Sequence, residues 1–296
     1  MTDLVMGYAR GYDWDQLKYW VNSLQATEFA GDVVIVTTSM DAATIDELKK
    51  RNVTVHIYGK DDGEGNFHSE PTAAPHVERF FYLWEFLDKN KERYAHSDIV
   101  TTDTRDVVFQ RNPFDDTMNS EPKWNIWSSE GLKYKDEPWG AQNYQSTFGE
   151  YFWNRIKEKE ILNVGVLAGD FDTIREYLIE IFQMSLNRPI PVVDQAVFNF
   201  LARECNQHNG ITKHEDAWAV QLGTTEAAVK SGAGDLGQRF GRSPTTVIQY
   251  NMLYQDSQPI IDDHVVRNQN LDEFAIVHQW DRVAGLKEKV EAKYGS

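Results

Sequence analysis

The chain contains, at residues 98–109, the stretch Asp98-Ile99-Val100-Thr101-Thr102-Asp103-Thr104-Arg105-Asp106-Val107-Val108-Phe109. Its first half is rich in β-branched residues, which is typical of a buried strand. Two carboxylates on either side of an arginine follow, and open α/β sheets bind ligands at the carboxyl ends of their strands. Paired carboxylates offer hard oxygen ligands to Mg²⁺ or Mn²⁺, and these ions in turn hold phosphates. The stretch therefore predicts a metal and phosphate site at the edge of a sheet.

The residues before this stretch alternate between strand and helix patterns. Apolar runs predict buried strands at 4–12, 32–38 and 53–58. Apolar residues at helical spacing predict helices at 14–24 and 41–51. This β-α-β-α-β order is typical of a parallel sheet with crossover helices. The sequence therefore predicts an α/β fold with a mostly parallel central sheet flanked by helices.

Between the third strand and residue 98, the sequence predicts a loop and a helix. Residues 59–75 are rich in glycine, proline and acidic residues, so we expect a mobile or lid-like loop. Residues 76–89 carry one apolar stripe, which predicts a helix docked on the sheet.

The second half of the chain has weaker patterns. We expect strands at 124–128, 161–169, 246–250 and 274–278. We expect helices at 171–186, 192–205 and 283–293. The segment 130–147 has little periodicity and 206–245 is rich in glycine, so both are predicted to be irregular. No internal repeat or low-complexity linker divides the chain, and we expect a single domain over 1–296.

Composition narrows the class of protein. The 296 residues are 41% hydrophobic, enough for a large core, and the formal net charge is −16. A chain this acidic is repelled by nucleic acid and by anionic membranes, so we expect neither as a partner. A lone cysteine, Cys205, excludes a disulfide framework and is expected to be packed in a helix. With no signal peptide and no transmembrane run, we expect a soluble, cytoplasmic protein.

Several residues are candidates for chemistry, each with a structural alternative. Asp103, Arg105 and Asp106 are either a metal and phosphate site or an ion-pair cluster at a strand end. His278 ends an apolar strand and is either a metal ligand through a neutral ring nitrogen or a packed structural histidine. Arg79 lies on the helix before the acidic stretch, where it is either a salt-bridge residue or a phosphate clamp.

Two further segments carry the same ambiguity. The glycines of Asn163-Val164-Gly165-Val166-Leu167-Ala168-Gly169 let a ligand or another backbone approach closely, but a bulge or packing contact explains them as well. Asp194-Gln195 begins a helix after Pro189 and Pro191, so Asp194 is either a first-turn acid or faces a sugar hydroxyl. Dinucleotide-binding, P-loop and nucleophile-elbow motifs are all absent from the sequence.

The order of these pieces resembles the GT-A glycosyltransferases, over about residues 3–282. The chain is most similar to the retaining branch that includes glycogenin and the bacterial lipooligosaccharide galactosyltransferases. It also resembles small viral and bacterial glycosyltransferase-like proteins that carry Thr-Asp-x-Arg-Asp-Val and a late Val-His-Gln-aromatic-Asp-Arg. The segments that match are 102–107 and 277–282.

The resemblance implies a role for each candidate. It implies that residues 1–112 form a nucleotide-binding half and 113–296 an acceptor-binding half. The donor nucleotide sugar would contact Tyr8, Ala9, Arg10, Arg79, Asp103, Thr104, Arg105, Asn163 and Gly165. Arg79 and the Asp194-Gln195 pair would act near the reacting carbon. Asp103, Asp106 and His278 would hold a divalent cation, Mn²⁺ or Mg²⁺.

One position departs from the pattern of the resembled family. The third residue of its Asp-x-Asp motif is Arg105 here, and the second acid is displaced to Asp106. Either Asp106 reaches the metal through a turn, or Arg105 replaces part of the cation as a counter-charge to the diphosphate. The lysine-bearing C-terminal signature of the glycogenin branch is also absent.

The implied activity is metal-assisted transfer of a hexose or pentose from a nucleotide sugar, with UDP favoured, to a glycan or other hydroxyl acceptor. Retention of configuration is preferred, while inversion would need a base such as Asp194 or Asp216. Segments 59–75 and 130–147 are candidates for donor closure and acceptor contacts. Trp139, Tyr144, Trp153 and Trp218 are candidates for stacking on sugars, although core packing explains each equally. The alternatives are a sugar-nucleotide nucleotidyltransferase and a non-catalytic nucleotide- or sugar-binding protein.

Overall fold

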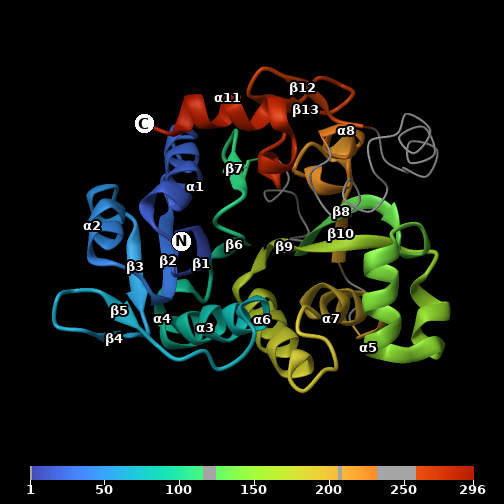
Figure 1. Cartoon of the computed structure of the whole chain (residues 1–296), viewed down its shortest axis with the longest axis horizontal. Helices are drawn as coiled ribbons and strands as arrows, with labels where there is room; N and C mark the ends of the chain where they lie inside the picture. Colours follow the sequence, from blue (N-terminus) through green and yellow to red (C-terminus); the bar gives the residue numbers. More distant parts are fainter. Residues whose placement is uncertain (1, 116–124, 206–208, 232–257) are drawn as a thin grey trace.

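A computed structural model describes residues 2–115, 125–205, 209–231 and 258–296. A seven-stranded sheet runs through its centre, in the order β10-β8-β9-β6-β1-β2-β3 (Figure 1). The strands are β1 (Leu4–Arg10), β2 (Asp32–Ser39), β3 (Thr54–Ile57), β6 (Asp98–Thr102), β8 (Asn125–Lys133), β9 (Glu160–Asp170) and β10 (Asn209–Thr212). Only β9 runs antiparallel to its neighbours within this sheet. The predicted single-domain α/β fold with a mostly parallel sheet is confirmed.

Helices cover both faces of the sheet (Figure 1). One face packs against α1 (Trp14–Ala26) and α2 (Ala42–Lys50). The other packs against α3 (Pro75–Lys89), α6 (Phe171–Ser185) and α7 (Asp194–Phe200). Aspartate side chains accept backbone N–H bonds at the start of three of these helices, which satisfies donors that a helix leaves open. These N-cap residues are Asp13, Asp41 and Asp170.

The alternation of side chains along β1 shows how the sheet is buried on both sides. Leu4, Met6 and Tyr8 point into the cluster with α3 and α6. Val5 and Ala9 point into the cluster with α1. Because both faces of β1 are covered, the strand has no charged residue from Leu4 to Ala9, as is usual for buried parallel strands.

The acidic stretch at 98–109 is not one strand. It divides into β6 and β7 (Val107–Phe109), which belong to different sheets, with Asp103–Asp106 at the break. A second sheet of three strands joins β7 to β14 (Ile276–His278) and β11 (Ala219–Gln221). It packs beneath α8 (Glu226–Ser231) and α11 (Ala284–Tyr294). The pairing of β6 with β9 extends to Thr102, and the N–H of Asp103 still donates to the carbonyl oxygen of Gly165 at 2.8 Å before the chain turns away to β7.

The prediction that residues 130–147 are irregular is wrong. β8 continues to Lys133, and α5 spans Pro138–Ile156. Glu137 caps this helix by accepting backbone N–H bonds from Trp139 and Gly140, and Pro138 occupies its first turn. Proline at that position is favoured because its missing N–H would have no helical partner there. The sequence analysis missed α5 because its buried face carries Gly140, Asn143 and Thr147 instead of an apolar stripe.

The segment 59–75 is a loop with a small hairpin, β4 (Lys60–Asp61) with β5 (Phe67–His68). Buried Glu78 holds its end, because this carboxylate accepts bonds from the backbone N–H of Thr72, from Arg10 and from the hydroxyl of Tyr8. Arg10 also donates to the carbonyl oxygen of Ser69. The loop is therefore tied to β1 and to the first turn of α3.

The remaining elements are short. They are α4 (Lys91–Tyr94), β12 (Ile260–Asp262) and β13 (Val265–Arg267). The predicted helix at 192–205 is α7 followed by a wide turn over Leu201–Cys205, and Cys205 is exposed rather than packed. The predicted strand at 246–250 lies outside the described residues. Within the parts that the structure describes, no helix has the length and apolar character that crossing a bilayer requires.

Candidate active site

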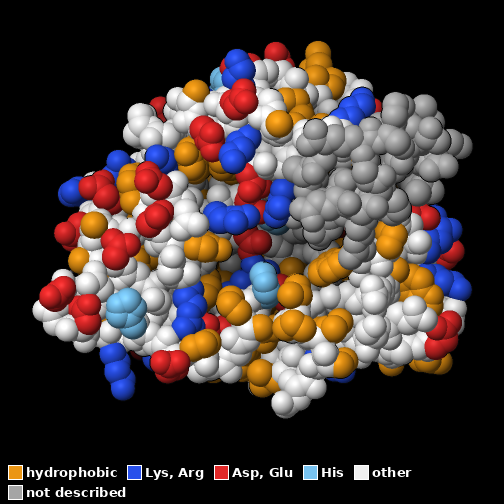
Figure 2. All heavy atoms as spheres, in the orientation of Figure 1, with side chains coloured by type: hydrophobic (Ala, Val, Ile, Leu, Met, Phe, Trp, Pro, Cys, Tyr) orange, Lys and Arg blue, Asp and Glu red, His pale blue; other side chains and the backbone are white. Residues whose placement is uncertain are grey.

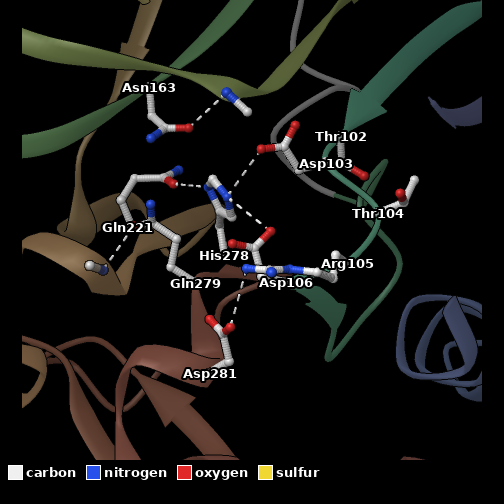
Figure 3. A network of polar contacts seen from close by, with 12 residues as sticks. Thr102, Asp103, Thr104, Arg105, Asp106, Asn163, Gln221, His278, Gln279 and Asp281 are labelled. Atoms are coloured by element: carbon white, nitrogen blue, oxygen red, sulfur yellow. Dashed lines mark hydrogen bonds and ion pairs between the residues drawn. The ribbon is translucent and has the colours of Figure 1, made fainter. Parts of the chain in front are cut away.

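Three residues from two segments of the chain meet at the break between β6 and β7 (Figure 3). Asp103 follows β6 and Asp106 precedes β7. His278 ends β14, whose antiparallel register with β7 pairs it with Val107. One ligand atom from each of the three side chains lies within 4.8 Å of the others. The structure thus brings together the residues that the sequence suggested as metal ligands.

The imidazole of His278 is oriented by Gln221 of β11. Its Nδ1 lies 2.6 Å from the Oε1 atom of Gln221, while the Nε2 of Gln221 donates to Ser128 at 3.0 Å. Because an amide oxygen can only accept, Nδ1 of His278 carries the hydrogen and Nε2 keeps its lone pair. The lone pair faces the two aspartates, 3.5 Å from Oδ2 of Asp103 and 3.6 Å from Oδ1 of Asp106.

No described residue forms a hydrogen bond with the Nε2 atom of His278, although this side chain is only 2% exposed. A buried acceptor without a partner is costly, and it faces two carboxylates. One imidazole nitrogen and two carboxylates suit a transition-type divalent cation such as Mn²⁺. The residues therefore fit a bound divalent cation.

Asp106 is the second carboxylate of this cluster. It supplies the acid that the Asp-x-Asp pattern would have at the position of Arg105. Burial alone would raise the pKa of Asp106, but the neighbouring His278 side chain and the positive charges of Arg105 and Arg282 lower it to about 2. The guanidinium of Arg105 is turned toward Asp281, 3.6 Å away, and its side chain is 45% exposed (Figure 3). The sequence left open whether Asp106 or Arg105 completes the cluster. In the structure, Asp106 lies in the cluster and Arg105 lies beside it.

Arg79 links the cluster to α7. One nitrogen donates to Asp103, and another donates to Oδ2 of Asp194 at 2.9 Å. The guanidinium also lies over the ring of Phe80. Both carboxylates are thus held in fixed positions by one cation, with geometry that a lysine could not supply.

β9 approaches the cluster closely at Gly165. A Cβ atom there would lie 2.5 Å from the His278 ring and 2.9 Å from an oxygen of Asp103. Only glycine leaves these two side chains in place at this position. The amide oxygen of Asn163 accepts the N–H of Gly165, and its amide nitrogen donates to the carboxylate of Glu130, each at 2.8 Å.

Glu130 was not suggested by the sequence analysis. It lies where β8 loses its regular pairing with β9, beside Gly131, whose φ of 73° is left-handed. Such bulges re-aim side chains and are frequent beside active sites. Burial raises the pKa of Glu130 to about 7, although the amide of Asn163 acts in the opposite direction.

These residues line one continuous cleft, formed by two adjoining cavities of about 270 and 330 Å³. The two cavities share the residues His76, Arg79, Asp103, His278, Gln279 and Arg282. Basic, acidic and histidine side chains gather around the hollow in the middle of the face shown in Figure 2. The cleft lies at the carboxyl end of β6, where open α/β sheets bind ligands.

Solved structures with the same architecture are glycosyltransferases. The bifunctional glycosyltransferase WbbM is matched over 100% of this chain and 52% of its own, at 10% identity and a TM-score of 0.53. The galactosyltransferase LgtC, solved with donor and acceptor sugar analogs, is matched over 97% of this chain and 94% of its own, at 11% identity and a TM-score of 0.51. The chain has the GT-A glycosyltransferase fold.

Another solved structure with this GT-A fold is GlyE of Streptococcus pneumoniae TIGR4, with 13% identity, a TM-score of 0.50 and coverage of 94% of this chain. The chain spans about half the length of WbbM and of GlyE. No protein-family model matches the sequence, and no curated protein matches it.

Within the GT-A fold, the donor-side residues suggested by the sequence are unequally placed. Tyr8, Arg10, Thr104 and Arg105 line the larger cavity. Ala9 does not line either cavity, because its side chain is fully buried against α1. Thr104 is nearly buried and donates its hydroxyl to the carbonyl oxygen of Tyr8 at 3.0 Å, which fixes the turn after β6 against β1.

The smaller cavity holds the remaining candidates. Asn163, Gly165, Asp194 and Gln195 line it, together with Glu130 and Trp139. Of the aromatic residues suggested for sugar stacking, Tyr144 and Trp218 are fully buried and unable to stack on a ligand. Trp153 packs beside the hydrophobic cluster under α5. Asp216 does not line the cleft, because it is exposed at the turn after β10.

Proposed function

We propose that the chain is a glycosyltransferase that moves a sugar from a nucleotide sugar, with a UDP-sugar favoured, to a hydroxyl of a glycan or other acceptor. The observation that carries the proposal is the lone pair of His278, which faces Asp103 and Asp106 inside the cleft of a GT-A fold. This arrangement supports a site for a divalent cation and, through it, for a diphosphate.

Asp103, Asp106 and His278 would hold the divalent cation, Mn²⁺ or Mg²⁺. When bound, it would supply positive charge for the departing nucleoside diphosphate. Gln221 keeps the His278 lone pair directed at the site, and Arg79 keeps Asp103 in place. These residues preorganise the cluster, so that little reorganisation accompanies the reaction.

Two arginines at the cleft are placed to add charge to the diphosphate site. The side chains of Arg105 and Arg282 are 45% and 34% exposed, and both line the larger cavity. Their ion pairs with Asp281 are long, at 3.6 and 3.5 Å, so they can exchange this partner for phosphate oxygens. Arg10 is not available for this role, because Glu78 and the carbonyl oxygen of Ser69 engage it.

We propose that residues 1–112 bind the nucleotide and 113–296 the acceptor. The larger cavity, lined by Tyr8, Thr104 and Arg105, would take the nucleoside diphosphate. The smaller one, lined by Asn163, Asp194 and Gln195, would take the donor sugar, a hexose or pentose, and the acceptor hydroxyl. Asp194 and Gln195 would lie near the reacting carbon, and retention of configuration remains our preference.

The alternative activities differ from glycosyl transfer in the residues that they require after the first strand or in whether they turn over a donor. A nucleotidyltransferase usually carries a basic, glycine-rich loop after that strand. Here Arg10 is the sole basic residue at this end of β1, and it is used to hold the loop at 59–75. This disfavours nucleotidyl transfer. A non-catalytic binding protein would bind nucleotide but turn over no donor.

Calorimetric titration with UDP in the presence of Mn²⁺ tests the donor site. We expect saturable heat that depends on Mn²⁺. Asp103→Ala and His278→Ala should each weaken this binding at least tenfold, because each removes a ligand. The matched control is Asp216→Ala, which changes an exposed aspartate outside the cleft and should leave the affinity unchanged.

A wild-type protein that gives no heat above buffer would contradict the proposal. A hydrolysis screen over UDP-, GDP- and dTDP-sugars then separates a transferase from a binding protein and names the donor. The anomeric configuration of the released sugar, followed by proton NMR, decides between retention and inversion. Release of an inverted sugar would reject our preference for retention.

A further inference from the structure

Among the residues that the structure describes, five acidic side chains line the cleft, and four of them are engaged. Asp103 and Asp194 share the guanidinium of Arg79. Asp106 faces His278 in the metal cluster. Glu137 accepts the backbone N–H groups that begin α5. These four carboxylates are therefore held by a cation, by the metal cluster or by a helix end. The fifth is Glu130.

The side chains that form hydrogen bonds with Glu130 are neutral amides. Its carboxylate accepts a hydrogen bond from the amide of Asn163 at 2.8 Å, and the amide of Gln195 acts on it as well. Within the described part of the chain, no lysine or arginine forms an ion pair with it. Its exposed fraction is 5%, and it lines the cavity that also contains Gln195 and Trp139. A carboxylate in this position is free to exchange a proton with a bound ligand.

We propose that Glu130 is the general base of the reaction, the group that takes the proton from the acceptor hydroxyl. This inference rests on the proposed glycosyltransferase function. With retention, the acceptor oxygen forms a bond to the anomeric carbon on the face that the diphosphate leaves, while its proton passes to the Glu130 carboxylate. The bond from the anomeric carbon to the diphosphate oxygen breaks, and its electron pair leaves with the diphosphate. The proton then leaves Glu130 for solvent before the next turnover.

The electrostatic setting agrees with this role. A general base works best when its pKa lies near the working pH. Burial raises the pKa of Glu130 to about 7, the negative charge of Glu137 acts in the same direction, and Asn163, Gln195 and His278 act against it. The remaining titratable group close to it is Tyr134, in the turn before α5. Neither Asp194 nor Asp216 is needed as the base.

The experiment compares Glu130→Gln, Glu130→Asp and Asp216→Asn. The probe is hydrolysis of the UDP-sugar that wild type turns over fastest, with water as the acceptor and Mn²⁺ saturating. We expect Glu130→Gln to lower kcat about 100-fold or more, the usual contribution of a positioned base. The affinity for UDP with Mn²⁺, measured by calorimetry, should stay within twofold. The wild-type acid limb, with an apparent pKa near 7, should disappear in Glu130→Gln. Asp216→Asn should match wild type.

The outcomes separate the two proposals. Suppose that wild type turns over a donor, and that Glu130→Gln keeps either more than a tenth of the wild-type kcat or the wild-type acid limb. Glu130 is then not the base, and the transferase function stands. If wild type neither binds UDP nor hydrolyses any donor, both proposals fail. Should Glu130→Gln not fold, Glu130→Asp decides, because a shorter carboxylate must lower kcat and move the acid limb. An unmoved limb in Glu130→Asp overturns the role.

Discussion

At the residue scale, one buried amide sets which nitrogen of His278 faces the two aspartates. Gln221 is fully buried and is the register partner of His278 in the neighbouring strand. Its amide nitrogen is held by Ser128, so the amide cannot turn over without losing a bond. Hydrogen bonds to the second nitrogen of a metal-binding imidazole commonly fix its tautomer and raise its basicity. Gln221 is therefore a positioning residue for the metal cluster.

We expect Gln221→Leu to weaken Mn²⁺ binding by about 10- to 100-fold, because the imidazole loses the bond that selects its tautomer. Electron paramagnetic resonance of free Mn²⁺ measures this directly. Gln142→Leu, which changes an exposed glutamine of α5 outside the cleft, is the control and should leave the affinity at the wild-type value. Equal affinity in Gln221→Leu and wild type would mean that Gln221 does not position the ligand.

The sequence predicted some site residues and missed others for a physical reason. A polar residue at the end of an apolar run can be recognised from the sequence alone. This is how the sequence analysis found Asp103, Asp106 and His278. Gln221 and Glu130 face the site only because of strand register and of a bulge. Register depends on contacts between segments far apart in the sequence, so no local sequence pattern predicts it. The glycine that follows Glu130, just after the predicted strand at 124–128, was a weak hint in the sequence.

At the element scale, β9 sets the space available to the metal cluster. Its backbone passes so close to His278 and Asp103 that only a glycine fits at residue 165. The same strand carries Asn163, which joins the cluster to Glu130. One strand therefore controls both ends of the smaller cavity.

Gly165→Ala should lower the Mn²⁺-dependent affinity for UDP at least tenfold, because the added methyl group displaces His278 or Asp103. Circular dichroism should remain unchanged, since the shift is local. Gly285→Ala makes the same chemical change at an exposed position of α11. No atom lies within 4 Å of the added methyl group there. That variant should bind UDP normally. If Gly165→Ala also binds normally, β9 does not constrain the cluster.

The elements themselves were predicted unevenly. The first three strands and their helices were found, since each buries one continuous apolar stripe or run. α5 was missed because its buried face includes Gly140, Asn143 and Thr147 and because it is kinked at Gly149, although Glu137 and Pro138 give a proper helix start. The acidic stretch was expected as one strand, but its two halves pair in different sheets. Sequence patterns show that a segment is extended, but they do not show which strand it pairs with.

At the scale of the whole molecule, the buried Glu130 makes stability depend on pH. Its pKa is about 7 in the folded protein, above the ordinary value of 4.5. Between these two pH values the unfolded chain has released the proton and the folded chain still holds it. The contribution of Glu130 to the free energy of unfolding is therefore fully present below pH 4.5 and is lost as the pH rises through 7.

We expect wild type to lose about 3 kcal/mol of unfolding free energy from this group between pH 4.5 and 8. Glu130→Gln removes the ionisation, so its Tm should fall less than that of wild type over the same range. Differential scanning calorimetry at several pH values measures the difference between the two proteins. Parallel pH dependences would show that Glu130 titrates with an ordinary pKa.

The antiparallel pairing of β14 with β7 also has a consequence for the order of synthesis. The ribosome completes the entire seven-stranded sheet before it adds His278, which follows Asp106 by more than half of the chain. A nascent chain can thus fold its main sheet with two carboxylates in place and still lack the imidazole. We expect competence to hold a cation to arise in one late step, when β14 docks beside β7.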